Sequence, residues 1–342
     1  MAPPEIQPVS QSASQPASRR PIREEREDMA SFAYTRGLHD LGHDLYAYLQ
    51  PPGTWGLSNA GLIVDGQATL LVDTLFDLKL TGQMLETMKR AVPAAAEIGT
   101  VVNTHANGDH CYGNQLVANA QIIASEQAAS EMQEDPPERL RTLLSQTASL
   151  PQLQRFLQRA FGAFDFSDIT LTPPTRTFRG ELTLHVGSKE VRLIEVGPAH
   201  TRGDIIVYVP SERVVFTGDI LFIGGHPIMW AGPTANWLRA CDLILQLDPE
   251  IIVPGHGPIT DQHGVSEVKG YLQYVYDEAR KRYEAGLSAL EAARDIPLDR
   301  YATWTDGERI VANVAAMYRE FSGDQSEPEK PLLFASMAAL AS

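Results

Sequence analysis

Cysteine, positive charge and long apolar runs are all scarce in this sequence of 342 residues. The two cysteines, Cys111 and Cys241, exclude a disulfide scaffold and are typical of a protein from a reducing compartment. The 28 Lys and Arg residues face 43 Asp and Glu, and the net charge of −15 argues against nucleic acids or anionic membranes as partners. No apolar run approaches the ~20 residues that a membrane-spanning helix needs. We therefore expect a cytoplasmic protein with a small-molecule substrate.

The composition changes along the chain and predicts its organisation. Residues 1–28 are rich in Pro, Ser, Gln and charge, which predicts a disordered leader. No apolar stretch follows the pair Arg19-Arg20, so an export signal is not expected. Residues 29–262 alternate short β-rich runs with helical segments, the rhythm of an α/β domain. Within them, residues 126–168 form a predicted helical insertion, and residues 263–342 a helical C-terminal extension.

Side chains that can bind a metal recur where predicted strands give way to loops containing glycine. The densest group is Thr104-His105-Ala106-Asn107-Gly108-Asp109-His110, and similar settings hold His200 (GPAHTRGD), Asp219 (FTGDIL) and His256 (VPGHG). Imidazole nitrogens and carboxylate oxygens are the ligands that suit Zn²⁺. Because functional sites collect at strand ends in α/β sheets, we expect these loops to converge on one metal centre.

In order and context these residues resemble the motifs of the metallo-β-lactamase superfamily. The shared pattern is an Asp that closes an early strand (Asp73), then H-x-H-x-D-H, and then a His, an Asp and a His, and it spans roughly residues 45–259. The resemblance implies an αββα four-layer sandwich of the α/β class, with the metal site along one edge.

The resemblance also implies two sets of ligands, one of which is altered here. The first set would be His105, position 107 and His200, the second Asp109, His110 and His256, and Asp219 would bridge the two metals. Position 107 is asparagine, so the motif reads H-x-N-x-D-H, and a carboxamide oxygen is a far weaker Zn²⁺ ligand than imidazole. We therefore predict one tightly bound Zn²⁺ in the second set and a weak or absent metal in the first. Asp73 is expected to orient the motif loop rather than to bind metal.

This ligand set predicts a zinc-dependent hydrolase in which a metal-bound hydroxide attacks a small organic molecule. An ester, a lactone, a thioester or an activated ring that undergoes displacement would all suit such a nucleophile. Asp109 or Asp219 could accept the proton of the water, and His105 and His200 would act as acid or base if the first metal is absent. Two alternatives are an iron-dependent oxidoreductase of the same fold and a binding or biosynthetic protein in which Asn107 marks the loss of hydrolysis.

Aromatic residues predict an apolar or aromatic substrate. Trp55 lies on the loop that overhangs the site in the resembled family, whereas Trp230 fits a pocket wall and core packing equally well. His226 is a candidate substrate contact because it lies in the loop after Asp219. The phenylalanines of the insertion indicate a lid or a dimer surface, so a homodimer is also considered.

Overall fold

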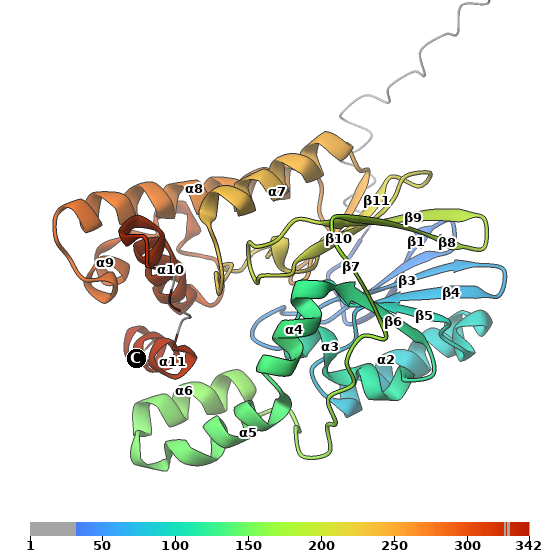
Figure 1. Cartoon of the computed structure of the whole chain (residues 1–342), viewed down its shortest axis with the longest axis horizontal. Helices are drawn as coiled ribbons and strands as arrows, with labels where there is room; N and C mark the ends of the chain where they lie inside the picture. Colours follow the sequence, from blue (N-terminus) through green and yellow to red (C-terminus); the bar gives the residue numbers. More distant parts are fainter. Residues whose placement is uncertain (1–31, 325, 327–328, 342) are drawn as a thin grey trace, which may run out of the picture.

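The computed structural model describes residues 32–324, 326 and 329–341, and the predicted leader lies outside them. Two β-sheets lie face to face, and helices cover their outer sides (Figure 1). A group of further helices packs together at the end opposite the hairpin turns of the sheets (Figure 1).

The first sheet contains seven strands in the order β1-β2-β3-β4-β5-β6-β7. Strands β1 to β4 are antiparallel, whereas β4 to β7 are parallel. The strands are β1 (Gly37–Gly42), β2 (Leu45–Leu49), β3 (Ala60–Asp65), β4 (Ala68–Val72), β5 (Thr100–Val102), β6 (Gln121–Ser125) and β7 (Arg176–Phe178). Strand β1 lies before residues 45–259, to which the resemblance was assigned, and its residues GLHDLG form an edge strand with little burial.

The second sheet contains five strands in the order β12-β11-β10-β9-β8. Its strands are antiparallel except for the parallel pair of β11 and β12. They are β8 (Glu181–Val186), β9 (Lys189–Glu195), β10 (Ile205–Val209), β11 (Val214–Phe216) and β12 (Ile251–Val253).

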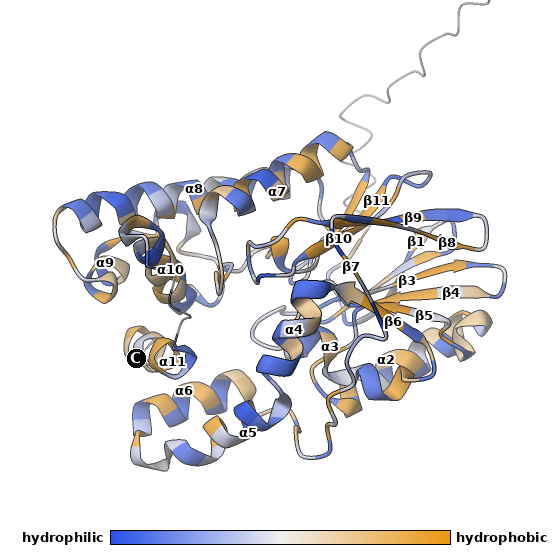
Figure 2. Cartoon of the chain, in the orientation of Figure 1, coloured by the Kyte–Doolittle hydropathy of each residue, from blue (hydrophilic) through white to orange (hydrophobic). Residues whose placement is uncertain are grey.

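The space between the sheets is filled by apolar side chains from both, such as Ile63 and Val102 of the first and Val191 and Val207 of the second. The sheets approach closely at Gly61, where an added Cβ would lie 2.3 Å from the ring of Phe216. Figure 2 shows this apolar character along β3 and β4, whereas the outer helices mix apolar and polar residues.

Helices complete the four layers. Helix α2 (Leu78–Ala91) covers the outer face of the first sheet with Met84 and Met88, and the side chain of Asp77 caps its first turn. Helices α7 (Thr234–Leu247) and α8 (Gln262–Glu284) pack on the outer face of the second sheet. The predicted αββα sandwich is therefore confirmed.

Helices α4, α5 and α6 occupy the stretch predicted as an insertion, between β6 and β7, and α9, α10 and α11 follow α8. Helix α11 packs against α6 and α10. The remaining helices are α3 (Gly108–Cys111), α4 (Glu126–Glu134), α5 (Pro137–Gln146), α6 (Pro151–Phe161), α9 (Ala289–Asp295), α10 (Ile310–Ser322) and α11 (Lys330–Leu340). Six short 3-10 helices are η1 (Pro93–Ala96), η2 (Tyr112–Val117), η3 (Thr147–Ser149), η4 (Gly218–Ile220), η5 (Asp299–Tyr301) and η6 (Gly307–Arg309).

No helix in the described part of the chain combines the length and the apolar composition needed to cross a bilayer.

Candidate metal centre

The predicted ligands lie in segments that follow four different strands. His105, Asp109 and His110 follow β5, His200 follows β9, Asp219 lies in η4 after β11, and His256 follows β12. Because these segments meet at one edge of the sandwich, residues up to 151 positions apart in the chain (256 − 105) become neighbours.

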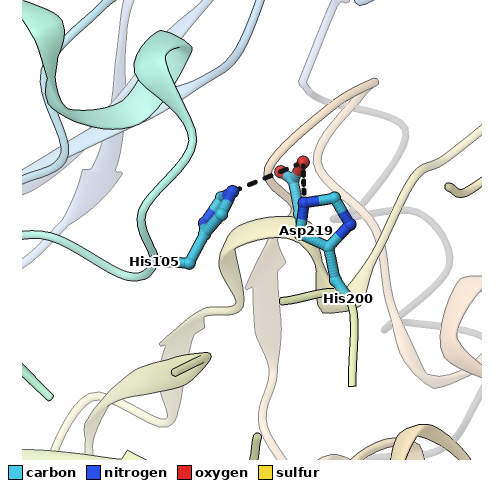
Figure 3. Close-up of side chains that lie close together, drawn as sticks. All are labelled: His105, His200 and Asp219. Atoms are coloured by element: carbon cyan, nitrogen blue, oxygen red, sulfur yellow. Dashed lines mark ion pairs between the residues drawn. The ribbon is translucent and has the colours of Figure 1, made fainter. Parts of the chain in front are cut away.

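Asp219 lies at the centre of this group. Its Oδ2 atom is 3.7 Å from Nε2 of His105, 3.3 Å from Nε2 of His200 and 3.5 Å from Nε2 of His256. Its Oδ1 atom is 3.0 Å from Nε2 of His110. Figure 3 shows the rings of His105 and His200 pointing toward this carboxylate from different segments.

The ligand atoms form two adjacent triads. The first triad is His105, His200 and Asp219, and the second is Asp109, His110 and His256; within each, the ligand atoms lie within 4.8 Å of one another. All six side chains are nearly inaccessible to solvent, with the exception of Asp109, which is 14% exposed. Asp109 therefore marks the side on which solvent reaches the centre.

Backbone carbonyl groups fix the protonation of two rings. Nδ1 of His200 lies 2.6 Å from the carbonyl oxygen of Ile228, and Nδ1 of His256 lies 3.1 Å from that of Gly53. A carbonyl oxygen only accepts hydrogen bonds, so each Nδ1 must carry the proton. In a neutral ring the lone pair is then on Nε2, the atom that faces the centre.

A single buried carboxylate fixes the other two rings. Oδ2 of Asp73 accepts from Nδ1 of His110 (2.9 Å) and from the hydroxyl of Thr104 (2.7 Å). Because the hydroxyl proton of Thr104 is directed to Asp73, its oxygen accepts from Nδ1 of His105 at 3.0 Å. Asp73 also accepts from the backbone N–H of Thr104 at 2.7 Å. Nε2 therefore carries the lone pair in His105 and in neutral His110.

The surroundings shift the pKa of His105 and His200 in one direction and that of His110 and His256 in the other. Burial lowers the pKa of His200 to about 4 and that of His105 well below its usual value, so both rings are neutral. Burial also acts to lower the pKa of His110 and His256, but nearby carboxylates, Asp219 foremost, overcome it. They raise the pKa of His256 to about 9 and hold that of His110 well above its usual value.

These residues fit a bound divalent cation. Nε2 of His105 is buried without a hydrogen-bond partner, and Nε2 of His110 and Oδ1 of Asp219, 3.0 Å apart, have no hydrogen-bond partner other than each other, an arrangement that is costly in a protein interior. Four imidazole nitrogens and two carboxylates form a donor set that suits Zn²⁺ and other divalent transition metals. A cation would give the orphaned atoms a partner.

Asn107 touches the first triad directly. Its side-chain oxygen, Oδ1, lies 2.7 Å from Nε2 of His200. Since that nitrogen has a lone pair, two acceptors would face each other unless a cation binds both. If the amide is turned over, its NH₂ group donates to His200 instead and occupies the lone pair that a metal would need. In both arrangements Asn107 lies against the atom of His200 through which a metal would bind.

Two of the predicted substrate contacts belong to an aromatic cluster, which we define as Trp55, Phe156, Phe161, Trp230 and Phe334. The ring centroid of Phe334 lies 5.8–6.3 Å from those of the other four. The indole nitrogen of Trp55 donates to Glu308 at 3.1 Å. The cluster adjoins the metal centre, because the backbone N–H of Trp230 donates to the carbonyl oxygen of His200 at 2.9 Å.

The third predicted contact, His226, does not fit a substrate-binding role. Its ring is fully buried, and Nδ1 lies 3.0 Å from the hydroxyl of Tyr271 while Nε2 lies 3.1 Å from the carbonyl oxygen of Tyr301. Both ring nitrogens therefore have protein partners, and burial lowers the pKa of the ring to about 4. The position of His226 after Asp219 was misleading, since its partners come from the C-terminal helices.

Two further residues that support the site, Arg309 and Asn313, lie in the C-terminal helices and were not predicted from the sequence. Arg309 is almost fully buried, with its guanidinium carbon 4.4 Å from the ring centroid of Trp55. Asn313 is fully buried on α10. A polar residue inside the apolar run IVANVAAM was the one available signal for Asn313.

Comparison with known proteins agrees with the observed fold. The family model of the metallo-beta-lactamase superfamily matches residues 53–256, which include all six candidate ligands. The chain belongs to the metallo-beta-lactamase superfamily. The resemblance seen in the sequence is thereby confirmed, and the superfamily is one of metallo-hydrolases.

Several relatives in the superfamily have curated names. The chain is 33% identical over 90 residues to "2,4-dinitroanisole O-demethylase subunit alpha" of Nocardioides sp. (strain JS1661), a match that covers 25% of this chain and 26% of that protein. It is 25% identical over 244 residues to "Probable metallo-hydrolase YqjP" of Bacillus subtilis, covering 65% and 72% of the two chains. Three curated relatives are matched over only 26–39% of their own length.

A solved structure shows that the fold likeness extends beyond the sandwich. The stereoselective inverting sec-alkylsulfatase Pisa1 from Pseudomonas sp. superposes with a TM-score of 0.61 at 16% identity, over 84% of this chain and 50% of that chain. At this identity the likeness concerns the fold alone.

Proposed function

We propose that this chain is a zinc-dependent hydrolase of small organic molecules that carry an apolar or aromatic group. The observation that carries the proposal is the convergence of four histidines, each with Nε2 directed at the centre, around the carboxylates of Asp219 and Asp109. A zinc ion bound there supplies a water of lowered pKa and a Lewis acid that polarises the group under attack.

Asp109 is the residue best placed to handle the proton of the attacking water. Burial alone would raise its pKa, but His110 and His256 hold the pKa below its usual value, so the carboxylate is ionised. It is also the most exposed of the six ligands and lies 3.3 Å from Nε2 of His256. We propose that Asp109 orients the water and accepts its proton. His105 and His200, both neutral, are the second pair of groups that can accept or return a proton.

We propose that the two triads differ in metal affinity. The second triad has two imidazoles and a carboxylate, and Asp219 completes it from 3.0 Å. The first triad shares Asp219 and has Asn107 against Nε2 of His200, where a third imidazole would give a stronger ligand. One zinc ion bound in the second triad and a weak or empty first triad follow from this difference.

The substrate class follows from the aromatic cluster beside the metal centre. Aromatic side chains favour an apolar or planar group by burial and by ring–ring contact. The likeness to a protein named for 2,4-dinitroanisole supports an activated aromatic ring as one substrate class. Aryl esters, lactones and thioesters are the other classes that the same nucleophile would attack.

The test combines metal analysis with a substrate panel. Freshly purified protein should contain close to one zinc per chain and should hydrolyse at least one member of a panel of aryl esters, lactones, thioesters and dinitrophenyl ethers. His110→Ala should lose both the zinc and the activity, whereas His185→Ala, which changes an exposed histidine on β8, should lose neither. Full activity in His110→Ala, or in metal-free wild-type protein, would show that the site is assigned wrongly.

A further inference from the structure

Three side chains of the C-terminal extension hold the loop that carries the hydrogen-bond partner of His200. Arg309 donates to the carbonyl oxygen of His226 and Arg319 to that of Trp230, and Asn313 binds the segment between them. Asn313 on α10 donates from Nδ2 to the carbonyl oxygen of Pro227 at 2.9 Å, and its Oδ1 accepts from the backbone N–H of Met229 at 2.8 Å. The two hydrogen bonds therefore fix the backbone at Pro227 and Met229, on either side of Ile228. Asn313 has no exposed surface, so water cannot replace these bonds.

Ile228, the residue between the two gripped positions, is the one that fixes the ring of His200. Its carbonyl oxygen accepts from Nδ1 of His200 at 2.6 Å. A peptide carbonyl turns only when the backbone on both sides turns with it, and here both sides are tied to one rigid carboxamide on a helix. Asn313 is therefore the side chain that directly restrains the two peptide planes next to the carbonyl that accepts from His200.

We propose that Asn313 is a positioning residue for His200, which it controls through the carbonyl of Ile228 without touching the metal centre. Its carboxamide holds that carbonyl at the angle that keeps the proton on Nδ1 and directs the Nε2 lone pair toward Asp219. This rests on the proposed function only in the use of His200 as a ligand of the weaker first triad, because the control of the ring itself needs no metal.

The same buried network offers a control for general loosening of the core. The hydroxyl of Tyr271 lies 3.3 Å from Nδ2 of Asn313 and 3.0 Å from Nδ1 of His226. Tyr271→Phe removes this hydroxyl and disturbs the network, but leaves both bonds from Asn313 to the 227–229 segment. Asn313→Ala removes both bonds. Asn313→Asp keeps the volume and the acceptor for Met229 but loses the Nδ2 donor to Pro227 and Tyr271, and it is the second variant if the alanine variant does not fold.

The experiment follows the ring N–H of His200 by NMR in metal-free, ¹⁵N-labelled full-length protein, with the signal assigned by its loss in His200→Ala. Wild type and Tyr271→Phe should show a slowly exchanging Nδ1–H. Its exchange should be at least about tenfold faster in Asn313→Ala and intermediate in Asn313→Asp. Wild-type exchange in Asn313→Ala, or equal acceleration in Tyr271→Phe, overturns the proposal.

A second readout separates this proposal from the proposed function. In a Zn²⁺ titration, the concentration that half-saturates the change in the His200 ring signals should rise about tenfold in Asn313→Ala, the lower end of the effect usual for residues that orient ligands. It should not change in Tyr271→Phe. If Zn²⁺ does not change the His200 signals in any variant, His200 is not a metal ligand. The exchange rate of its Nδ1–H still decides whether Asn313 positions the ring.

Discussion

Replacing Asp73 by asparagine should shift a proton within the metal centre while leaving the fold intact. Asp73 accepts three hydrogen bonds, from the backbone N–H and hydroxyl of Thr104 and from Nδ1 of His110. In Asp73→Asn one oxygen remains. If it stays opposite the N–H of Thr104, the new NH₂ group faces Nδ1 of His110, 2.9 Å away in the present structure. In the neutral ring that metal binding requires, that nitrogen must then give up its proton and become the acceptor.

The one proton of the neutral ring is then held on the other nitrogen, where a metal would bind. Nε2 of His110 lies 3.0 Å from Oδ1 of Asp219, so the proton finds an acceptor there and the lone pair is lost to the cation. The opposite orientation of the amide is no better, because it leaves the buried N–H of Thr104 without an acceptor, at a cost of about 1–3 kcal/mol. We expect Zn²⁺ affinity to fall about 10- to 100-fold, which corresponds to about 1.4–2.7 kcal/mol.

The assay is competition for Zn²⁺ against a chromophoric chelator at neutral pH. Asp65→Asn is the matched control, because it removes the same charge from a carboxylate that accepts from the backbone N–H and hydroxyl of Ser188 far from any candidate ligand. The control should bind Zn²⁺ as wild type does. Unchanged affinity in Asp73→Asn, with thermal unfolding near that of wild type, would refute the assignment of Nε2 of His110 as a ligand.

Three further predictions concern the metal count, the pH and the substrate. Asn107→His should raise bound zinc from near one to near two per chain after dialysis against a weak chelator; two zinc ions in the wild type would contradict the role given to Asn107. Because the pKa of His256 is about 9 in the metal-free protein, its ring must lose a proton before binding. Zn²⁺ affinity should therefore increase as the pH rises toward 9, and calorimetry in buffers of different ionisation enthalpy should detect proton release at pH 7. Phe161→Ala should raise KM for an aromatic substrate about tenfold, the effect of losing roughly 1.4 kcal/mol of ring contact, whereas Phe166→Ala, equally buried but outside the aromatic cluster, should lower only the stability.

Five of the six candidate ligands could be predicted from the sequence because each follows a short strand with a readable apolar signal. His105, Asp109 and His110 follow the run TVV, and Asp219 and His256 follow VVF and IIV, all of them strands buried in the sandwich. The sheet then brings the ends of these strands together, as the alternation of strands and helices predicts. The resemblance to the superfamily added the pairing of ligands into two sets, which spacing alone does not define.

The partners that hold the rings were not predictable in the same way. Nδ1 of His200 and Nδ1 of His256 donate to the backbone carbonyls of Ile228 and Gly53, and every residue has a backbone carbonyl. Which one faces a ring depends on the path of the loop, and that path depends on long-range contacts. The error over His226 has the same origin, because its position in the chain is close to Asp219 while its hydrogen bonds go to Tyr271 and Tyr301.

The boundary expected near residue 262 divides the chain by secondary structure, but the C-terminal helices also support the metal centre. Asn313 forms hydrogen bonds with the backbone of Pro227 and Met229, in the segment that orients His200. On the other triad, the guanidinium carbon of Arg309 lies 5.3 Å from the ring centroid of Phe222, and this ring stacks on His256 at 4.9 Å with an interplanar angle of 3°. One histidine of each triad, His200 and His256, is thus supported indirectly by residues of the C-terminal extension. The helices after residue 262 are consequently part of the machinery that orients the ligands, and variation in them should change metal affinity even where the motif loops are identical.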